Sequence, residues 1–194
     1  MSALTRRKTY TPEEYLALEE KAEYKSEYEN GEIVAMAGGT FNHIRITSNI
    51  SRFIGNKVSE DCSSLPNDMK IWVEAISKFY YPDVTVLCGE PSFYRERDDT
   101  ITNPILIVEV LSKSTEAKDR GEKFMAYQTL DSLQEYVLIS QNRPTIEQFI
   151  KQSDRSWKYL ATIGLESSVK FESIGVELTL NEIYQRVNFK QENL

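Results

Sequence analysis

Two acidic residues stand out because of the segments in which they lie. Asp83 follows Pro82 and opens the largely apolar run 84–88. Glu109 stands 26 positions later and is the single charged residue of the apolar segment 105–111. An ionised carboxylate inside such a strand costs several kcal/mol unless a cation or hydrogen-bond donors compensate it. The pattern therefore predicts a compensating group beside Glu109.

A hard divalent cation is the partner that this pair of carboxylates favours. If the two strands are neighbours, Asp83 and Glu109 can bind one Mg²⁺ together with a backbone carbonyl. A water activated by such an ion can attack a phosphodiester. Two other interpretations stay open, since Pro-Asp is common in turns and a strand glutamate can meet an arginine across the sheet. A glycosidase is a weaker third hypothesis, because its carbohydrate cleft needs aromatic platforms and the chain has only two tryptophans.

The elements that must position these residues follow from turn signals and apolar spacing. Thr11, Pro12 and Glu14 form a capping box that predicts a short helix to about residue 21, and Asn30-Gly31 predicts a hairpin turn. Apolar residues spaced by three and four predict a long helix over 41–58. The other expected elements are strands at 69–73, 83–88, 105–111 and 136–140, helices at about 115–130 and 181–187, and an antiparallel extension over 145–150, 156–163 and 169–171.

This order of elements predicts an α/β fold of one domain. The core reads helix, three strands, helix, strand, and segment 105–111 is expected to be a central strand covered on both faces. A chain of 194 residues fits one domain, which we place at residues 11–187 between an N-terminal tail, 1–10, and a C-terminal tail, 188–194.

Composition narrows the class of protein. With 30 acidic and 23 basic residues the net charge is −7, which argues against a sequence-independent nucleic-acid coat protein but leaves open an enzyme acting on DNA. Cys62 and Cys88 are the only cysteines, and without a signal peptide they predict reduced thiols and a cytoplasmic protein. No apolar run approaches the roughly 18 residues of a membrane span. A single histidine and the lack of a Cys-x-x-Cys pattern disfavour a zinc site.

The motifs in this order resemble a known nuclease group. Pro82-Asp83 followed by Glu109-Val110-Leu111, on an αβββαβ order, is similar to the PD-(D/E)XK nuclease superfamily. Within it, the chain resembles the Uma-type restriction endonuclease family, formerly a domain of unknown function, from about residue 11 to residue 187. The closer likeness is carried by the stretch 109–115, by Asp119-Arg120-Gly121-Glu122-Lys123 with Tyr127, and by Glu27 before Asn30-Gly31.

One position departs from the superfamily pattern. The superfamily's lysine should stand two residues after the glutamate, where this chain has Leu111. In the resembling group a lysine on the following helix takes that role, and Lys123 matches it. Asp119, Lys123 and Tyr127 follow one another at four-residue steps and so share one helix face. Without the family likeness, Asp119 and Lys123 would be interpreted as an ordinary surface pair.

The resemblance implies a restriction-endonuclease-like core, with a mixed central sheet flanked by helices, and a Mg²⁺-dependent endonuclease acting on DNA as a homodimer. Mn²⁺ is a possible substitute for Mg²⁺. The rival hypothesis is a catalytically inactive protein of the same fold that serves as a nucleic-acid-binding or assembly module. The residues implied are Asp83, Glu109 and Lys123 for catalysis, Asp83, Glu109 and the Val110 carbonyl for the metal, Glu27, His43, Asp119 and Tyr127 in support, and Lys113, Lys118 and Arg120 for phosphate.

Overall fold

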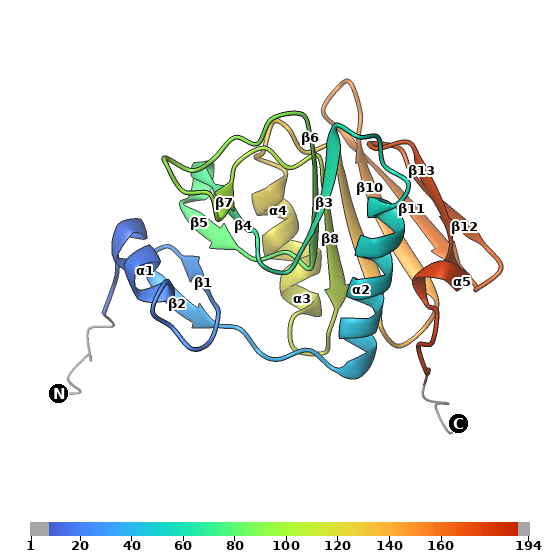
Figure 1. The fold of residues 1–194 in the computed structure, drawn as a ribbon, viewed down its shortest axis with the longest axis horizontal. Coiled ribbons are helices and arrows are strands. Elements are labelled where there is room, and N and C mark those ends of the chain that lie inside the picture. Colours follow the sequence, from blue (N-terminus) through green and yellow to red (C-terminus); the bar gives the residue numbers. More distant parts are fainter. Residues whose placement is uncertain (1–7, 190–194) are drawn as a thin grey trace.

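The computed structural model describes residues 8–189, so the expected tails lie largely outside the described residues. Figure 1 shows two main sheets side by side, with helices packed on both faces of the larger one. The strands of the smaller sheet lie between residues 26 and 101 and those of the larger sheet between residues 62 and 163, so the two sheets are interleaved in sequence.

The larger sheet has six strands in the order β11-β10-β9-β8-β6-β3. Its central strand β8 runs parallel to β9 and antiparallel to β6, so the sheet is mixed. All six residues of β8 are buried, as expected for a strand covered on both faces. The strands are β3 (Cys62–Pro66), β6 (Val84–Cys88), β8 (Leu106–Leu111), β9 (Glu135–Ser140), β10 (Thr145–Lys151) and β11 (Trp157–Ile163).

Helices cover the two faces of this sheet. The long helix α2 (Phe41–Gly55) buries Ile46, Ile50 and Ile54 against the face that carries Val108. The opposite face, which carries Ile107, is covered by a helical run in three parts. These parts are α3 (Glu116–Lys118), the π-helical segment η2 (Asp119–Lys123) and α4 (Phe124–Tyr127).

The smaller sheet has five strands in the order β2-β1-β5-β4-β7. Its hairpin turns at Asn30 and Gly31, whose φ angles of 50° and 94° are the positive values that the sequence predicts there. Helix α1 (Pro12–Glu19) packs beside it and begins with the predicted capping box of Thr11 and Glu14. The strands are β1 (Ser26–Glu29), β2 (Glu32–Ala35), β4 (Lys70–Val73), β5 (Lys78–Tyr80) and β7 (Thr100–Ile101), and a 3-10 turn η1 (Glu74–Ile76) joins β4 to β5.

The C-terminal part extends the larger sheet and closes the domain. β10 and β11 form the predicted antiparallel extension, followed by the hairpin β12 (Ser168–Phe171) and β13 (Val176–Thr179). A short helix α5 (Leu180–Ile183) then packs its buried residues with α2 on the same core cluster. The expected α/β architecture, a mixed central sheet flanked by helices with an antiparallel C-terminal extension, is confirmed.

Two expectations from the sequence are corrected, one about the place of a strand and one about the cysteines. The strand expected at 69–73 does not join the central sheet but lies in the smaller one, and β3 takes the third place beside β6. Cys62 and Cys88, expected as reduced thiols, form a disulfide with their Cα atoms 4.0 Å apart. The reason lies in the pairing of β3 with β6, which sets these two residues directly opposite each other.

No helix within residues 8–189 is long and apolar enough to cross a membrane.

Candidate acidic active site

Asp83 and Glu109 meet where β6 begins and β8 ends. Val84 pairs with Val108, so the residue before β6 and the residue after Val108 lie next to each other. Asp83 Oδ2 accepts a hydrogen bond of 2.7 Å from the Val110 backbone N–H, which ties the aspartate to the glutamate's strand. The adjacency of the two strands that the metal hypothesis required is therefore confirmed.

The ammonium group of Lys123 lies at the centre of the acidic residues. Its Nζ is 3.0 Å from Glu109 Oε1, 3.0 Å from Glu27 Oε1 and 3.5 Å from Asp119 Oδ1. The Tyr127 hydroxyl donates to Glu109 Oε1 over 3.1 Å. β1, β8 and the helical run after β8 thus bring these side chains together, and all of them are buried.

The charges of this cluster are unevenly balanced. Burial raises the pKa of Glu109 well above its usual value, and the neighbouring Asp119, Asp83 and Glu27 add to that rise against the opposing Lys123. Burial also raises the pKa of Asp119. The carboxyl groups of Glu27, Glu109 and Asp119 share the Lys123 ammonium group, so acidic groups outnumber the central positive charge.

Glu27 and Lys123 keep their charges in spite of their burial. Burial alone would raise the pKa of Glu27, but the ammonium groups of Lys123 and Lys118 together lower it. Burial alone would lower the pKa of Lys123, but Glu109, Glu27 and Asp119 raise it well above its usual value. Lys123 therefore stays charged because the carboxylates surround it.

His43 completes the solvent-facing side of the site. Its Nε2 is 3.2 Å from Asp83 Oδ2, and the two side chains are 18% and 15% exposed. Burial lowers the pKa of His43, but the hydrogen bond and charge of Asp83, with Asp119 and the Val110 carbonyl, raise it above its usual value overall. The Thr40 hydroxyl accepts from the His43 backbone N–H over 3.2 Å and fixes the start of α2.

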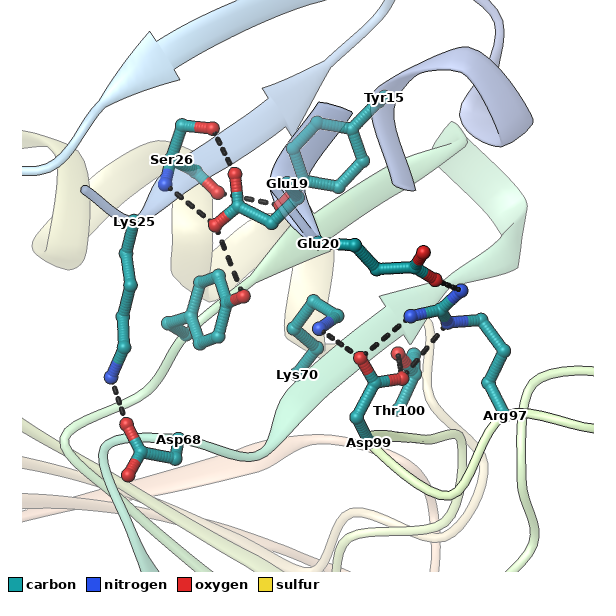
Figure 2. Close-up of polar contacts among 11 residues, drawn as sticks. Tyr15, Glu19, Glu20, Lys25, Ser26, Asp68, Lys70, Arg97, Asp99 and Thr100 are labelled. Atoms are coloured by element: carbon teal, nitrogen blue, oxygen red, sulfur yellow. Dashed lines mark hydrogen bonds and ion pairs between the residues drawn. The ribbon is translucent and has the colours of Figure 1, made fainter. Parts of the chain in front are cut away.

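A polar network anchors the two strands that carry Glu27 and Asp83. In Figure 2 the carboxylate of Glu19, at the end of α1, points to Ser26, which directly precedes Glu27. Glu19 Oε1 also accepts from the Tyr81 hydroxyl over 3.1 Å, two residues before Asp83. No signal in the sequence pointed to this role, because Glu19 is one of many surface-type glutamates in the chain.

Other predicted residues lie around the site with different partners. Lys118 Nζ is 2.7 Å from Glu27 Oε2 and also pairs with Glu29, so it belongs to the acidic cluster. Arg120 points elsewhere: its guanidinium binds both carboxylate oxygens of Glu147, each at 2.7 Å, and is not free for a phosphate. Lys113 is exposed in the loop after β8.

Asp68 and Lys70, where β4 begins, have partners outside the acidic cluster. Figure 2 shows Lys25 paired with Asp68, and Lys70 paired with Asp99. The Lys70 Nζ to Asp99 Oδ2 distance is 2.6 Å, and Arg97 bridges Asp99 to Glu20, the residue that follows α1. These pairs hold α1 and β7 to β4 and do not contribute to the acidic cluster.

The donor chemistry of the cluster fits a hard divalent cation. Its side chains supply carboxylate oxygens, and Glu27 Oε1 and Asp119 Oδ1 are buried with the Lys123 ammonium group as their ion-pair partner. No three His, Cys, Asp or Glu side chains within residues 8–189 surround a common point as ligands would. Lys123 Nζ occupies the central position among the carboxylates of Glu27, Glu109 and Asp119.

The chain matches a family model described as "Putative restriction endonuclease", Uma2, over residues 12–181. The chain belongs to this family. Two proteins of Synechocystis sp., both described as uncharacterized, are also similar to it. One is 37% identical over 88% of this chain and 97% of its own length, and the other is 38% identical over 92% and 93%.

A solved structure supports the fold of this Uma2 family member. It is a crystal structure described as that of a putative nuclease belonging to DUF820 from Anabaena variabilis. The TM-score is 0.71 over 90% of this chain and 97% of the other, at 18% sequence identity. At that identity the likeness establishes the architecture, while the family match supports a nuclease.

Proposed function

We propose that this chain is a metal-dependent endonuclease that hydrolyses DNA phosphodiester bonds. The observation that carries the proposal is that Asp83 and Glu109 lie at adjoining interior strands of a restriction-endonuclease-like sheet, with Lys123 from the covering helical run beside Glu109. Structural ion pairs alone rarely need so many buried carboxylates around one ammonium group, because each buried charge costs free energy. Perturbed pKa values in such a cluster are typical of functional sites.

In this proposal Asp83, Glu109 and the Val110 carbonyl hold Mg²⁺, with Mn²⁺ as a substitute. The ion would lower the pKa of a bound water and offset negative charge on the phosphate. Asp83 already lies beside the Val110 peptide, and His43 lies near the Val110 carbonyl. The three oxygen donors therefore come from adjoining segments of backbone.

The surrounding side chains have separate roles. The Lys123 ammonium group orients the attacking water or offsets charge that develops on the phosphate. Glu27 and Asp119 keep Lys123 charged, and Tyr127 fixes Glu109 through its hydroxyl. His43, whose pKa is raised, contacts a phosphate oxygen from the exposed side.

Cleavage assays with isosteric variants test the proposal. Supercoiled plasmid and single-stranded circular DNA are incubated with Mg²⁺ or Mn²⁺, and with chelator as a blank. Asp83→Asn and Glu109→Gln are expected to abolish cleavage and to unfold cooperatively, while the matched control Asp131→Asn cleaves normally, since Asp131 is 94% exposed and remote. Cleavage that persists in both site variants would rule the assignment out.

One observation favours the non-catalytic alternative: Lys123 occupies the place where ligands would converge. A bound ion stabilises the folded state by mass action, so millimolar Mg²⁺ or Mn²⁺ should raise the melting temperature of the wild type but not of Asp83→Asn. Equal melting temperatures with and without metal, together with no cleavage, would favour the binding or assembly module.

We further propose that residues 11–187 act as one domain and that two copies form a homodimer, since two-fold symmetry places one site against each strand of a duplex. Sedimentation equilibrium measures this directly, and a monomer at every concentration would contradict it.

A further inference from the structure

The first turns of α2 expose apolar side chains next to the acidic cluster. Phe41 is 64% exposed and Ile44 is 58% exposed, and Met36 in the preceding segment is 38% exposed. The Arg45 guanidinium lies over the Phe41 ring, 5.3 Å from its centroid. Phe41 therefore presents ring surface that a planar partner could cover, beside a guanidinium group that already lies over the ring.

This aromatic face adjoins the candidate site. His43, between Phe41 and Arg45 in sequence, contacts Asp83. The Thr40 hydroxyl bonds the side chain of Gln141, whose amide donates to the Leu111 carbonyl over 2.8 Å. The start of α2 is thus held at the end of the sheet where the parallel strands β8 and β9 end. In Figure 1 this is the lower end of α2 and β8.

Unpaired positive charges border the same face. In the part of the chain that the structure describes, Arg45 and Lys113 have no carboxylate within 4.0 Å, and the buried Nε of Arg45 has no hydrogen-bond acceptor. Arg186 also lacks such a pair, and Asn188, two residues further on, accepts from the Asn42 side chain. In contrast, Lys118 and Arg120 are fully engaged by glutamates. Basic side chains without carboxylate partners, beside an exposed aromatic ring, fit a nucleic acid, because its phosphates are negative and its bases are planar.

We propose that Phe41, covered by Arg45, is a stacking platform for an unpaired base of DNA, with Lys113 contacting the adjacent phosphates. The inference rests on the proposed function and specifies its substrate class. A base inside a duplex is already stacked on both sides, so a single exposed ring can accept only a nucleotide that is unpaired. The preferred substrates would be single strands, flaps or bubbles, held so that the next phosphate lies beside His43 and Asp83.

Equilibrium binding without cleavage tests the inference. The full chain is titrated into a fluorescein-labelled single strand and into the matching duplex, in chelator, and anisotropy is measured. The wild type should bind the single strand more tightly, and Phe41→Ala should weaken that binding at least about fivefold while leaving duplex binding unchanged. Phe41 is largely exposed, so the variant should keep the wild-type melting temperature.

Two further variants separate stacking from charge. Arg45→Lys keeps the charge and removes the planar guanidinium, so it should weaken single-strand binding without changing the salt dependence. The control Arg155→Ala removes an arginine that is 82% exposed in the turn between β10 and β11. This turn lies at one end of β10, whereas the loop that contacts Thr40 through Gln141 lies at the other end. The control should bind as the wild type does.

The outcomes are distinguishable from those of the cleavage assays. Equal affinity of wild type and Phe41→Ala for the single strand, tighter binding of duplex, or no binding of either DNA would overturn the inference even if plasmid is cleaved. Selective loss of single-strand binding in Phe41→Ala would support it even if no cleavage is found.

Discussion

Replacing Lys123 by methionine removes the central positive charge and keeps most of the side-chain length. The Lys123 side chain is 6% exposed, and its Nζ lies 3.0 Å from two carboxylate oxygens. At an effective dielectric constant of about 20, each such contact is worth roughly 5 kcal/mol of gross attraction, most of which offsets the cost of burying the charges. The net loss in the free energy of unfolding is therefore set by the buried carboxylates that the variant leaves without a partner.

Breaking a buried ion pair from one side typically costs about 3–5 kcal/mol. For a domain of this size each kcal/mol lowers the melting temperature by roughly 2–4 °C, so Lys123→Met should melt about 6–20 °C below the wild type at pH 7. Lys57→Met is the matched control, because Lys57 pairs with Glu182 at the surface and is 41% exposed. Its loss should cost less than about 1 kcal/mol.

The pH dependence of this difference has a definite sign. Without Lys123 the folded-state pKa values of Glu109 and Asp119 rise further above those of the unfolded chain. The pKa of Glu27 also rises, because one of the two ammonium groups that lower it is lost. The folded state then binds more protons, so the variant is stabilised as pH falls from 7 towards the unfolded carboxylate pKa near about 4. The difference in melting temperature between the wild type and Lys123→Met should therefore be smaller at pH 5 than at pH 7.

Thermal unfolding followed by circular dichroism, at both pH values and with added Mg²⁺ or Mn²⁺, checks the reasoning. The metal should restore more of the melting temperature in Lys123→Met than in the wild type, because the ion no longer competes with the ammonium group for the carboxylates. A variant that melts within about 2 °C of the wild type at pH 7, less than the shift from 1 kcal/mol, would refute the central role of Lys123.

Two further predictions concern the same site. Burial raises the pKa of Glu109, so wild-type stability falls as pH rises from the unfolded carboxylate pKa to the folded one, by about 1.4 kcal/mol for each pH unit between them. Glu109→Gln should therefore flatten the pH dependence of stability, measured by urea unfolding from pH 4 to pH 8. A steeper dependence in the variant would contradict the prediction. A Cβ on Gly39 would stand 3.0 Å from His43 Nδ1, so Gly39→Ala should move the imidazole away from Asp83 and lower the pKa of His43. NMR titration of the chain's one histidine measures this pKa, and an unchanged titration would count against the contact.

Local signals predicted local structure well. The capping box of Thr11 and Glu14 and the Asn30-Gly31 turn act within four residues of chain, and both are present as predicted. Which strand joins which sheet depends on contacts far apart in sequence. β4 reads like any other buried strand, but its neighbours β5 and β7 place it in the smaller sheet, while the more polar β3 was not singled out at all.

The disulfide was missed for the same reason. Cys62 and Cys88 become neighbours only because β3 pairs with β6 in one register, and a slip of one residue would move them apart. Asp83 and Glu109 could be proposed from the sequence, in contrast, because a carboxylate in an apolar strand is unusual in itself. His43 and Glu27 drew attention through the family likeness, and the network around Glu19 has no sequence signature.

The place of the lysine explains the π-helical segment in this fold. Leu111, two residues after Glu109, lies on the same face of β8 and packs in the core cluster beneath the helical run. A lysine there would lose that packing, so the positive charge comes instead from the helix that covers the face. Asp119, Lys123 and Tyr127 must all point inward, and η2 spans the residues from Asp119 to Lys123, with both ends buried. π-turns interrupt the regular helical phase and occur often at functional sites. At the two ends of this turn, Asp119 Oδ1 and Lys123 Nζ lie 3.5 Å apart, and the same Nζ is 3.0 Å from Glu109 Oε1.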